Sequence, residues 1–302
     1  MIEIEDISVI LGSQKVHNKN FEKKLGFKKN QIINKTGIKY RYISNKEETA
    51  ESLAISAVKK LLFKKSVKDI SHIISVTNTP SFLFPSVSHF VHAKLKMQDE
   101  IQCIGINAGC TGFVDALYLA YKLIKNNKKI LIVTTDTYTK FINKNDRSIV
   151  PLFSDGASAV MIKFSKKGMV LKKSIFSTTK NTTLDLCGSW NKKNKQEIIM
   201  NGANVLSFVI SDVLPNIKKL IKNKNKSAIV CHQAGKIVFS EIKKNVKNNI
   251  LIPQNYSNYG NLVSTSIPNL LYRKKDILKR KKNILFSGFG VGLSQSHLLF
   301  SR

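Results

Sequence analysis

The sequence predicts an α/β protein built from two similar halves, and two patterns carry this prediction. Short apolar runs of strand length alternate with longer segments of helical period. The order strand, helix, strand, helix, strand then occurs twice with similar spacing. We expect the halves to be residues 1–165 and 166–302, joined where lysines flank Gly168. The alternative is two ordinary α/β halves without internal equivalence.

The first half is expected to open with a strand at residues 2–12 and a short exposed helix at 18–29. Residues 35–41 read as a turn into an extended run. Residues 47–63 have helical period, with acidic residues in the first turn and lysines later, as the helix dipole favours. Three apolar runs are the expected buried strands of this half: 71–76, 101–106 and 129–134.

The second half repeats this order with strands expected at 227–230, 250–252 and 283–286. Residues 179–199 have no clear period and contain the one tryptophan, Trp190, so we expect a loop insertion that shapes a pocket. Polar residues follow several strands in both halves. Because sites in open α/β sheets collect at the carboxyl ends of strands, a duplicated chain is expected to bring both sets of ends to one pocket.

Composition limits the class of protein. The 302 residues are 42% hydrophobic, which argues against disorder. The four cysteines, at positions 103, 110, 187 and 231, lack the spacing of a zinc site or a disulfide framework. We expect no signal peptide, and no apolar run reaches the roughly 20 residues that a membrane span needs. These features predict a cytoplasmic protein.

The formal charge of +31 suggests an anionic partner. Nearly all of it is lysine; the arginines that could offer a planar fork to phosphates or guanines are Arg41, Arg147, Arg273, Arg280 and Arg302. The lysines are spread over many segments rather than gathered in one stretch. We therefore favour an acidic protein or a phosphorylated carrier as partner, attracted electrostatically, over nucleic acid.

Residues 101–125 have the sequence of a reactive-thiol corner. An apolar run ends at Asn107, and Cys110 stands at the head of a segment with helical period. Unpaired N–H groups at a helix start carry partial positive charge, so a thiolate there is expected to be favoured. The alternative is that Cys110 is a small buried hydrophobe.

Three further residues stand at expected strand ends or turns and could assist Cys110. They are His232, Asn261 and Gly288. A thiol can attack a thioester when donors stabilise the tetrahedral oxyanion. A histidine and an asparagine could then stabilise an enolate, and a glycine lets a backbone N–H approach closely. Each residue alone could equally be structural.

The motifs that surround these residues resemble those of one family, the β-ketoacyl-acyl-carrier-protein synthase III enzymes of the thiolase fold. In chain order they are TGIKYRYIS, FPS, NAGCTGFVDAL, NDRSIVPLFSDGASAVMI, MNGANV, CHQAG, YGNLVSTSIPNLL and SGFGVG. The resemblance covers essentially the whole chain. It implies a layered α-β-α-β-α arrangement and a cytoplasmic acyltransferase of fatty acid or related acyl-chain synthesis.

The same resemblance implies a reaction and its residues. An acyl thioester would load Cys110, and His232 and Asn261 would act on malonyl-acyl carrier protein in a decarboxylative Claisen condensation. The backbone amides of Cys110 and Gly288 would form the oxyanion hole. Coenzyme A thioesters and phosphopantetheine carriers would be substrates, with no metal or redox cofactor. Asn261 separates the chain from the elongating enzymes, which have a second histidine at this position.

The resemblance also implies contacts at the entrance and between subunits. Arg147 would contact the nucleotide end of coenzyme A, and Phe84 would reach the partner subunit's acyl pocket in a homodimer. Lys35 replaces an arginine before the TGI motif, and Lys236 adjoins the position at which the family docks its acidic carrier protein.

Departures from the family leave the acyl donor open. The family's HQAN motif ends here in Gly235, and Gln31 stands where a tryptophan is common. A carrier-bound donor is as plausible as acetyl-CoA. One alternative function is acyl transfer from Cys110 to an amine or hydroxyl, as in glycan or secondary metabolite synthesis. A second alternative is a non-catalytic basic binding module.

Overall fold

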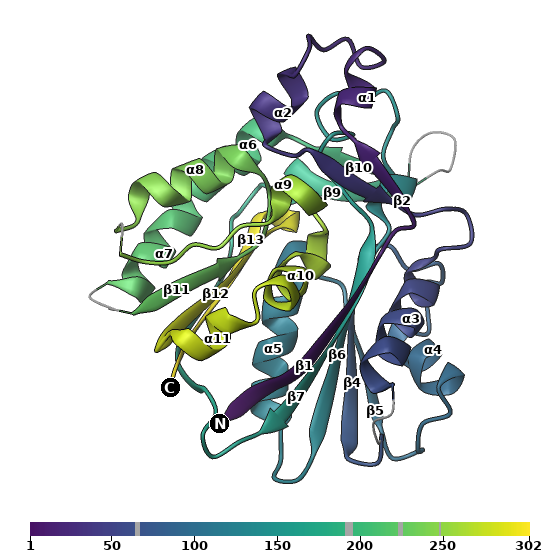
Figure 1. Cartoon of the computed structure of the whole chain (residues 1–302), viewed down its shortest axis with the longest axis vertical. Coiled ribbons are helices and arrows are strands. Elements are labelled where there is room, and N and C mark those ends of the chain that lie inside the picture. The colour runs from purple at the N-terminus through teal and green to yellow at the C-terminus, as the bar shows by residue number, and fades with distance from the viewer. Residues whose placement is uncertain (64–66, 191–195, 223–225, 248) are drawn as a thin grey trace.

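A computed structural model describes residues 1–63, 67–190, 196–222, 226–247 and 249–302. Within these ranges the chain forms two main β-sheets, one in each half, with helices between them and on their outer faces (Figure 1). The predicted α/β fold is confirmed.

The first sheet has the strand order β1-β7-β6-β4-β5. Its strands are β1 (Ile2–Leu11), β4 (Ile70–Val76), β5 (Gln102–Ile106), β6 (Lys129–Asp136) and β7 (Gly156–Phe164). β4 pairs in parallel with β5 and with β6, whereas β7 runs antiparallel to β6 and β1. The carboxyl ends of β4, β5 and β6 therefore meet at one edge, where the Cys110 corner follows β5.

The second sheet has the order β11-β12-β13-β8. Its strands are β8 (Val170–Thr178), β11 (Ser227–Cys231), β12 (Asn283–Gly290) and β13 (Ser294–Ser301). β11 and β12 are parallel, and β13 runs antiparallel to β12 and β8. This repeats the directions of the first sheet, with β8 in the place of β1, β11 in that of β4, β12 in that of β6 and β13 in that of β7. The predicted duplication is thus present in the sheets.

The prediction of a full strand at residues 250–252 is wrong. In the part of the chain described here, Leu251 forms one isolated parallel bridge with Ala228. The bridge lies beside β11, in the position that β5 occupies beside β4 in the first half. Pro253 follows at once, and because proline has no N–H it cannot extend the ladder.

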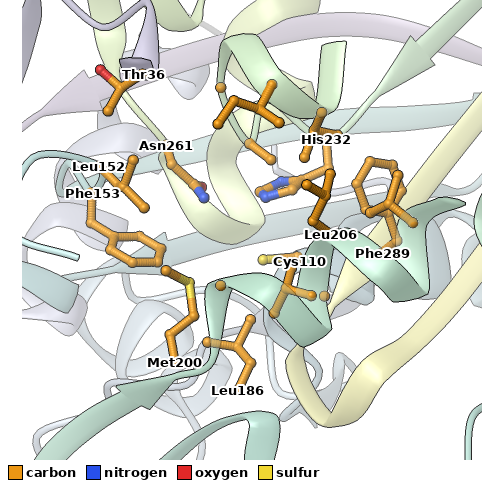
Figure 2. A pocket seen from close by; sticks show the side chains of 18 of the residues that line it. Thr36, Cys110, Leu152, Phe153, Leu186, Met200, Leu206, His232, Asn261 and Phe289 are labelled. Carbon is orange, nitrogen blue, oxygen red and sulfur yellow. The ribbon is translucent and has the colours of Figure 1, made fainter. Parts of the chain in front are cut away.

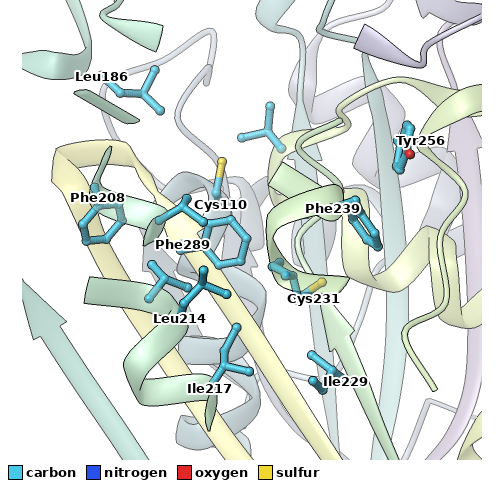
Figure 3. Packing of buried hydrophobic residues seen from close by; sticks show 14 of the residues in the cluster. Cys110, Leu186, Phe208, Leu214, Ile217, Ile229, Cys231, Phe239, Tyr256 and Phe289 are labelled. Atoms are coloured by element: carbon cyan, nitrogen blue, oxygen red, sulfur yellow. The ribbon is translucent and has the colours of Figure 1, made fainter. Parts of the chain in front are cut away.

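Three hydrophobic clusters fill the four contacts between five layers. One joins the outer helices α3 (Ala50–Leu62) and α4 (Val87–Lys94) to the first sheet. The second joins both sheets to the central helices α5 (Gly112–Leu123) and α10 (Ser266–Arg273). The third joins the second sheet to the outer helices α7 (Leu214–Ile221) and α8 (Lys236–Asn245) (Figure 3). The α-β-α-β-α layering is confirmed.

The remaining elements are short and lie mostly near the carboxyl ends of the strands (Figure 1). The strands are β2 (Gln14–His17), β3 (Tyr40–Ile43), β9 (Leu186–Trp190) and β10 (Gln196–Met200). The α-helices are α1 (Lys19–Glu22), α2 (Gln31–Thr36), α6 (Gly202–Phe208), α9 (Tyr256–Tyr259) and α11 (Asp276–Arg280). The 3₁₀ turns are η1 (Gly109–Thr111), η2 (Tyr138–Lys140), η3 (Thr183–Asp185), η5 (Val263–Thr265) and η6 (Val291–Leu293), and η4 (Val209–Val213) is a π-helical turn joining α6 to α7.

Local sequence explains where the predicted helices end. The helix expected at 47–63 begins at Ala50 because Thr49 caps it, with Thr49 and Ser52 bonding each other's backbone N–H in a capping box. The helix expected at 18–29 is shorter: α1 ends at Glu22, and the turn that follows reaches Gly26, which has a left-handed conformation with φ of +65°. Gly37 likewise ends α2 with φ of +72°, and the chain then enters β3.

The prediction of a loop at residues 179–199 is wrong for most of the residues that the structure describes there. It contains η3 and a hairpin of β9 and β10. In this hairpin Leu186 pairs with Met200 at one end, and Trp190 pairs with Gln196 at the other. Leu186 and Ile198 are buried from this hairpin, which gives it the apolar contact that fixes its register. Residues 191–195, and the side chain of Trp190, lie outside what the structure describes.

The two halves are linked by residues 165–169, between β7 and β8. We propose residues 1–165 and 166–302 as the two structural units, since this link passes from the first sheet to the second. In the described ranges, no helix is both long enough and apolar enough to cross a membrane.

Candidate active site

Cys110, His232 and Asn261 line one cavity of about 300 Å³ (Figure 2). Cys110 lies in η1 after β5, His232 follows β11, and Asn261 follows α9. Their exposed fractions are 4%, 2% and 6%. Three residues that are distant in the sequence therefore converge in a largely apolar space that excludes most water.

The position of Cys110 differs slightly from the expected helix start, because α5 begins at Gly112. Gly109 has φ of +48°, and a Cβ there would collide with Asn78 Oδ1. Burial is the main cause that raises the pKa of the Cys110 thiol to about 12, and Asp136 adds to it. The expectation of a resting thiolate is thus wrong, since loss of water in the apolar cavity outweighs the nearby N–H groups. The resting group is a thiol.

The backbone N–H groups of Cys110 and Val291 are those that favour negative charge on the Cys110 sulfur. Gly288, the donor expected from the sequence, is instead buried within β12, and a Cβ there would lie 2.7 Å from Thr111 Cα. Gly288 thus allows η1 to pack on β12. The glycine beside the thiol is Gly290, where a Cβ would lie 3.0 Å from Cys110 Sγ. The backbone N–H that lies at the Cys110 sulfur, besides that of Cys110 itself, is therefore that of Val291 and not that of Gly288.

His232 is a neutral imidazole at ordinary pH. Burial lowers its pKa to about 4, against a smaller opposing effect of the Val263 backbone. Its backbone N–H donates to the Ser287 carbonyl at 2.9 Å, which extends the β11–β12 pairing to the residue itself. Its ring meets the Phe289 ring edge-on, 5.8 Å between centroids. Its Nδ1 atom is buried and has no hydrogen-bond partner among the described residues.

Asn261 is held by its backbone and by its own side chain. Its N–H donates to the Leu152 carbonyl at 2.9 Å, and its carbonyl accepts from Ser154 N–H at 2.8 Å. Its Oδ1 accepts from Val263 N–H at 2.9 Å. This bond turns the amide so that its nitrogen points toward Cys110 and His232 (Figure 2). Asn261 is thereby oriented as a donor into the cavity.

Asp136, at the end of β6, is a buried carboxyl that sequence reasoning missed. It accepts from the N–H of Asn78 at 2.9 Å and from the N–H and hydroxyl of Ser264. Burial raises its pKa to about 7, although these hydrogen bonds oppose the rise. The sequence did contain a signal for this residue, because an aspartate stands at the end of the apolar run of β6. A carboxyl buried at the end of a strand needs several hydrogen-bond donors.

The cavity entrance carries two of the three expected cations. Lys35 and Lys236 line it and are exposed, and Lys236 Nζ donates to the Asn34 carbonyl at 3.1 Å. Arg147 is not among the lining residues. Its guanidinium donates to the Gly26 carbonyl at 2.9 Å and lies 4.5 Å from the centroid of the Phe27 ring.

Phe84 lies outside the cavity of its own chain. It is 83% exposed, next to Leu83 with the same exposure and Phe82 at 53%. These three residues follow β4 in a loop that ends at α4.

Several wall residues of the cavity were not predicted by residue number. They are Tyr138, Leu152, Phe153, Leu186, Met200, Val205, Leu206, Val209, Phe289 and Val291. Most stand in or beside the motifs already singled out, such as MNGANV and SGFGVG. Which motif residue faces the cavity depends on turn geometry that spacing alone does not give.

The arrangement of this site suits acyl transfer through a thiol. A buried cysteine faces two backbone donors that can hold an oxyanion, and a neutral histidine and an oriented amide stand across the cavity. Over the described residues, no group of three or more His, Cys, Asp or Glu side chains could hold a metal ion. Together with the duplicated five-layer fold, this arrangement is that of a thiolase-like enzyme.

Comparison with known proteins narrows that class. Residues 104–179 match the family described as 3-oxoacyl-[acyl-carrier-protein (ACP)] synthase III, and residues 218–301 match its C-terminal part. The β-ketoacyl-[acyl-carrier-protein] synthase III of Streptococcus sanguinis is 32% identical over 290 residues, covering 89% of each chain. That of Clostridium acetobutylicum is 31% identical over 300 residues, covering 92% of each. The crystal structure of the Aquifex aeolicus synthase III superposes with a TM-score of 0.85 at 26% identity, covering 100% of both chains.

The chain therefore belongs to the 3-oxoacyl-ACP synthase III family, and it is an acyltransferase of the condensing type. The resemblance inferred from the motifs is confirmed. Membership in an enzyme family leaves the interpretation as a non-catalytic basic binding module without support.

Proposed function

We propose that this enzyme joins an acyl group, held on Cys110, to a malonyl group carried on acyl carrier protein, and so starts an acyl chain. The observation that supports this most is the convergence of Cys110, His232 and Asn261 on one buried cavity. The products would be a β-ketoacyl thioester and carbon dioxide.

The first half-reaction loads the acyl group. Cys110 sulfur attacks the thioester carbonyl while its proton passes to neutral His232, whose low pKa leaves the ring free to accept it. The N–H groups of Cys110 and Val291 hold the oxyanion. The carbon–sulfur bond of the donor then breaks, and the departing thiolate takes the proton back from His232. The enzyme is left as an acyl-cysteine with a neutral histidine.

The second half-reaction forms the carbon–carbon bond. His232 and the amide nitrogen of Asn261 donate to the carbonyl oxygen of the malonyl thioester. Loss of carbon dioxide leaves its electron pair in an enolate that these two donors stabilise. The enolate carbon attacks the acyl-cysteine carbonyl, the Cys110 sulfur leaves as a thiolate, and it takes up a proton from water to restore the thiol. Neutral donors suit this step, because a nearby cation would instead hold the malonyl carboxylate.

The entrance supports an acidic carrier as the partner. Lys35 and Lys236 stand at the entrance, and Lys243 and Lys244 continue along α8. With a formal charge of +31, the surface would speed the approach of an acidic protein in a salt-dependent way. The acyl donor would be a coenzyme A or carrier thioester.

A homodimer is also proposed. Phe82, Leu83 and Phe84 form an apolar segment at the surface, and such segments commonly mark protein interfaces. We expect sedimentation to give a dimer and Phe84→Asp to shift it toward monomer.

Acylation of Cys110 is the test of this function. Intact-protein mass spectrometry after incubation with acetyl-CoA or acetyl-carrier should show one acetyl adduct, absent from Cys110→Ala. Cys103→Ala is the matched control, because Cys103 lies on β5 outside the cavity, and this variant should load normally. Failure of every acyl donor to load the wild-type enzyme would contradict the proposal.

A further inference from the structure

The turn η5 has a costly backbone conformation close to the active site. Val263, its first residue, has φ of +51°, a left-handed conformation that a β-branched residue rarely adopts. At the matching place in the first half, η1 begins with Gly109, which has φ of +48° and no Cβ to oppose it. A conformation that glycine adopts freely in one half is thus imposed on a valine in the other. Contacts around η5 must hold it there.

The strained residue is the one that orients Asn261. The Val263 N–H donates to Asn261 Oδ1 at 2.9 Å, and the amide nitrogen of Asn261 then faces the cavity (Figure 2). Only the nitrogen of the amide can donate a hydrogen bond to an enolate oxygen, because the amide oxygen is an acceptor. The direction of the Val263 N–H therefore decides which end of the Asn261 amide the cavity receives.

The residues after Val263 are tied to β6 of the first half. The N–H and the hydroxyl of Ser264 both donate to Asp136, the N–H at 3.1 Å. The Thr265 hydroxyl bonds the Thr134 hydroxyl at 2.8 Å. Thr134 and Asp136 are two positions apart in β6, so their side chains leave the strand on the same face. All four polar residues are buried, and three hydrogen bonds thus fix η5 to the other half of the chain.

The chain before η5 is fixed independently. The Asn261 N–H donates to the Leu152 carbonyl at 2.9 Å, and the Asn261 carbonyl accepts from Ser154 at 2.8 Å. Two residues lie between this anchor and the anchor at Ser264. Since both ends of so short a span are held, Val263 stays in the left-handed region. Release of the Ser264 anchor would let Val263 relax, and its peptide group would turn away from Asn261.

We propose that Asp136 and Ser264 are positioning residues for the step that forms the carbon–carbon bond. By holding η5, they keep the N–H of Val263 aimed at Asn261, so that the amide nitrogen serves the enolate. Neither Asp136 nor Ser264 lines the cavity, so both act through other residues. The first half thus supports condensation through β6, besides supplying Cys110. This inference rests on the proposed function and adds positioning residues to its second half-reaction.

The experiment separates loading from condensation. Enzyme that carries acetyl on Cys110 is mixed with malonyl-carrier, and mass spectrometry follows the loss of acyl-Cys110 and the appearance of β-ketoacyl product. The readout is the ratio of the condensation rate to the loading rate, because a loss of folded enzyme lowers both rates equally. Ser264→Ala should load at about the wild-type rate. Its ratio should fall about tenfold to a hundredfold, since a shift of about 1 Å near the reacting atoms can cost about a hundredfold.

A second substitution tests whether the Ser264 bonds act through the backbone of Val263. Val263→Gly removes the steric cost of the left-handed conformation. Ser264→Ala should therefore lower the ratio by a smaller factor in the Val263→Gly background than in the wild-type background. A purely structural role would leave the ratio unchanged in both. Ser8→Ala is the matched control, because Ser8 is buried, donates to the Ala57 carbonyl and does not line the cavity; its ratio should equal that of the wild type.

If Ser264→Ala does not fold, Thr265→Val decides the question. It keeps the shape of the side chain and removes the bond to Thr134, which retains its bond to Ser158, so the ratio should fall by a smaller factor. An unchanged ratio in Ser264→Ala, or in Thr265→Val where Ser264→Ala does not fold, overturns the inference. An equal fall in the wild-type and Val263→Gly backgrounds overturns it as well. A wild-type enzyme that loads acetyl but forms no β-ketoacyl product contradicts the proposed function itself.

Discussion

The two central helices each follow a 3₁₀ turn, and the two turns have nearly the same backbone. η1 begins at Gly109 with φ of +48°, and η5 begins at Val263 with φ of +51°. The second residue of η1 is Cys110, and the second residue of η5 is Ser264. The duplicated fold thus places a small nucleophilic side chain at the same point in both halves.

The surroundings of these two side chains differ. Cys110 lines the cavity, with the N–H of Val291 near its sulfur. The Ser264 hydroxyl donates to the buried carboxyl of Asp136, and Ser264 is 1% exposed. The turn η1 therefore presents a nucleophile to the cavity, whereas η5 binds the carboxyl at the end of β6. Position in the fold does not make a residue catalytic; access to the cavity and to oxyanion donors does.

The largest expected effect is on acyl loading, when the second residue of η1 and the second residue of η5 are replaced in separate variants. Cys110→Ser should lower acyl loading by about a thousandfold or more, since a buried serine without a strong base is a poor nucleophile. Ser264→Ala should still load Cys110 but lose about 1–3 kcal/mol of unfolding free energy, because Asp136 loses a donor. Loading rates and urea unfolding of both variants measure this. Equal loss of loading in the two variants would show that the turns do not differ as described.

The glycine of the catalytic turn should be needed for space as well as for conformation. Gly109→Ala should cost about 3 kcal/mol, because a Cβ there collides with Asn78 and lies 2.8 Å from Val291 Cγ2. Gly292→Ala is the matched control: its φ is +66° and no atom lies within 4 Å of the added Cβ, so about 1 kcal/mol is expected. Urea unfolding gives both values. Similar costs would mean that the contact with Asn78 is easily relieved.

Asp136 bonds Ser264 of η5 and raises the pKa of Cys110 in η1, and its titration should be visible in the stability of the enzyme. Its pKa is raised from 3.8 to about 7 in the folded state, so its proton contributes stability fully below about pH 4. That contribution is lost as the pH rises to 7, at about 1.4 kcal/mol for each pKa unit. Asp136→Asn should remove this slope between pH 4 and 7. Urea unfolding across that range tests it, and an unchanged slope would assign the titration to other groups.

A smaller effect distinguishes two buried histidines with the same pKa direction. Burial lowers the pKa of His232 and of His297 to about 4, so each contributes stability above pH 6.5 that is lost as the pH falls through 4. His297 bonds Gln295 and lies outside the cavity. His297→Gln should reduce the loss of stability at acid pH and leave the condensation rate within about twofold of the wild-type rate. His232→Gln should soften the same loss but abolish condensation.

The sequence was sufficient for the fold class and for the residues that converge. Apolar runs of strand length and helical period predicted β4, β6, β11, β12 and the central helices, because burial on both faces leaves a clear pattern. It failed at residues 250–252, where Pro253 interrupts pairing, and at the β9–β10 hairpin, whose register depends on apolar contacts with distant elements.

The finer features of the site depended on turn geometry and burial. Sequence reasoning chose Gly288 as the oxyanion donor, but the turn after β12 brings Val291 N–H to the sulfur instead. It expected a thiolate at Cys110 because local N–H groups favour one, whereas the whole protein removes the water that a thiolate needs. Asp136 and Tyr138 were missed because their roles come from residues far away in the chain, namely Ser264 and Asn78.

The central claim is that the first half carries the acyl group and the second half makes the carbon nucleophile. Asn261→Ala tests this most directly in one mass spectrometric measurement with an acyl donor and malonyl-carrier present together. The account predicts that acyl-Cys110 accumulates to full occupancy while β-ketoacyl product falls by about a hundredfold or more. Product formation at the wild-type rate by Asn261→Ala, or the absence of acyl-Cys110 in it and in the wild-type enzyme, would contradict the account.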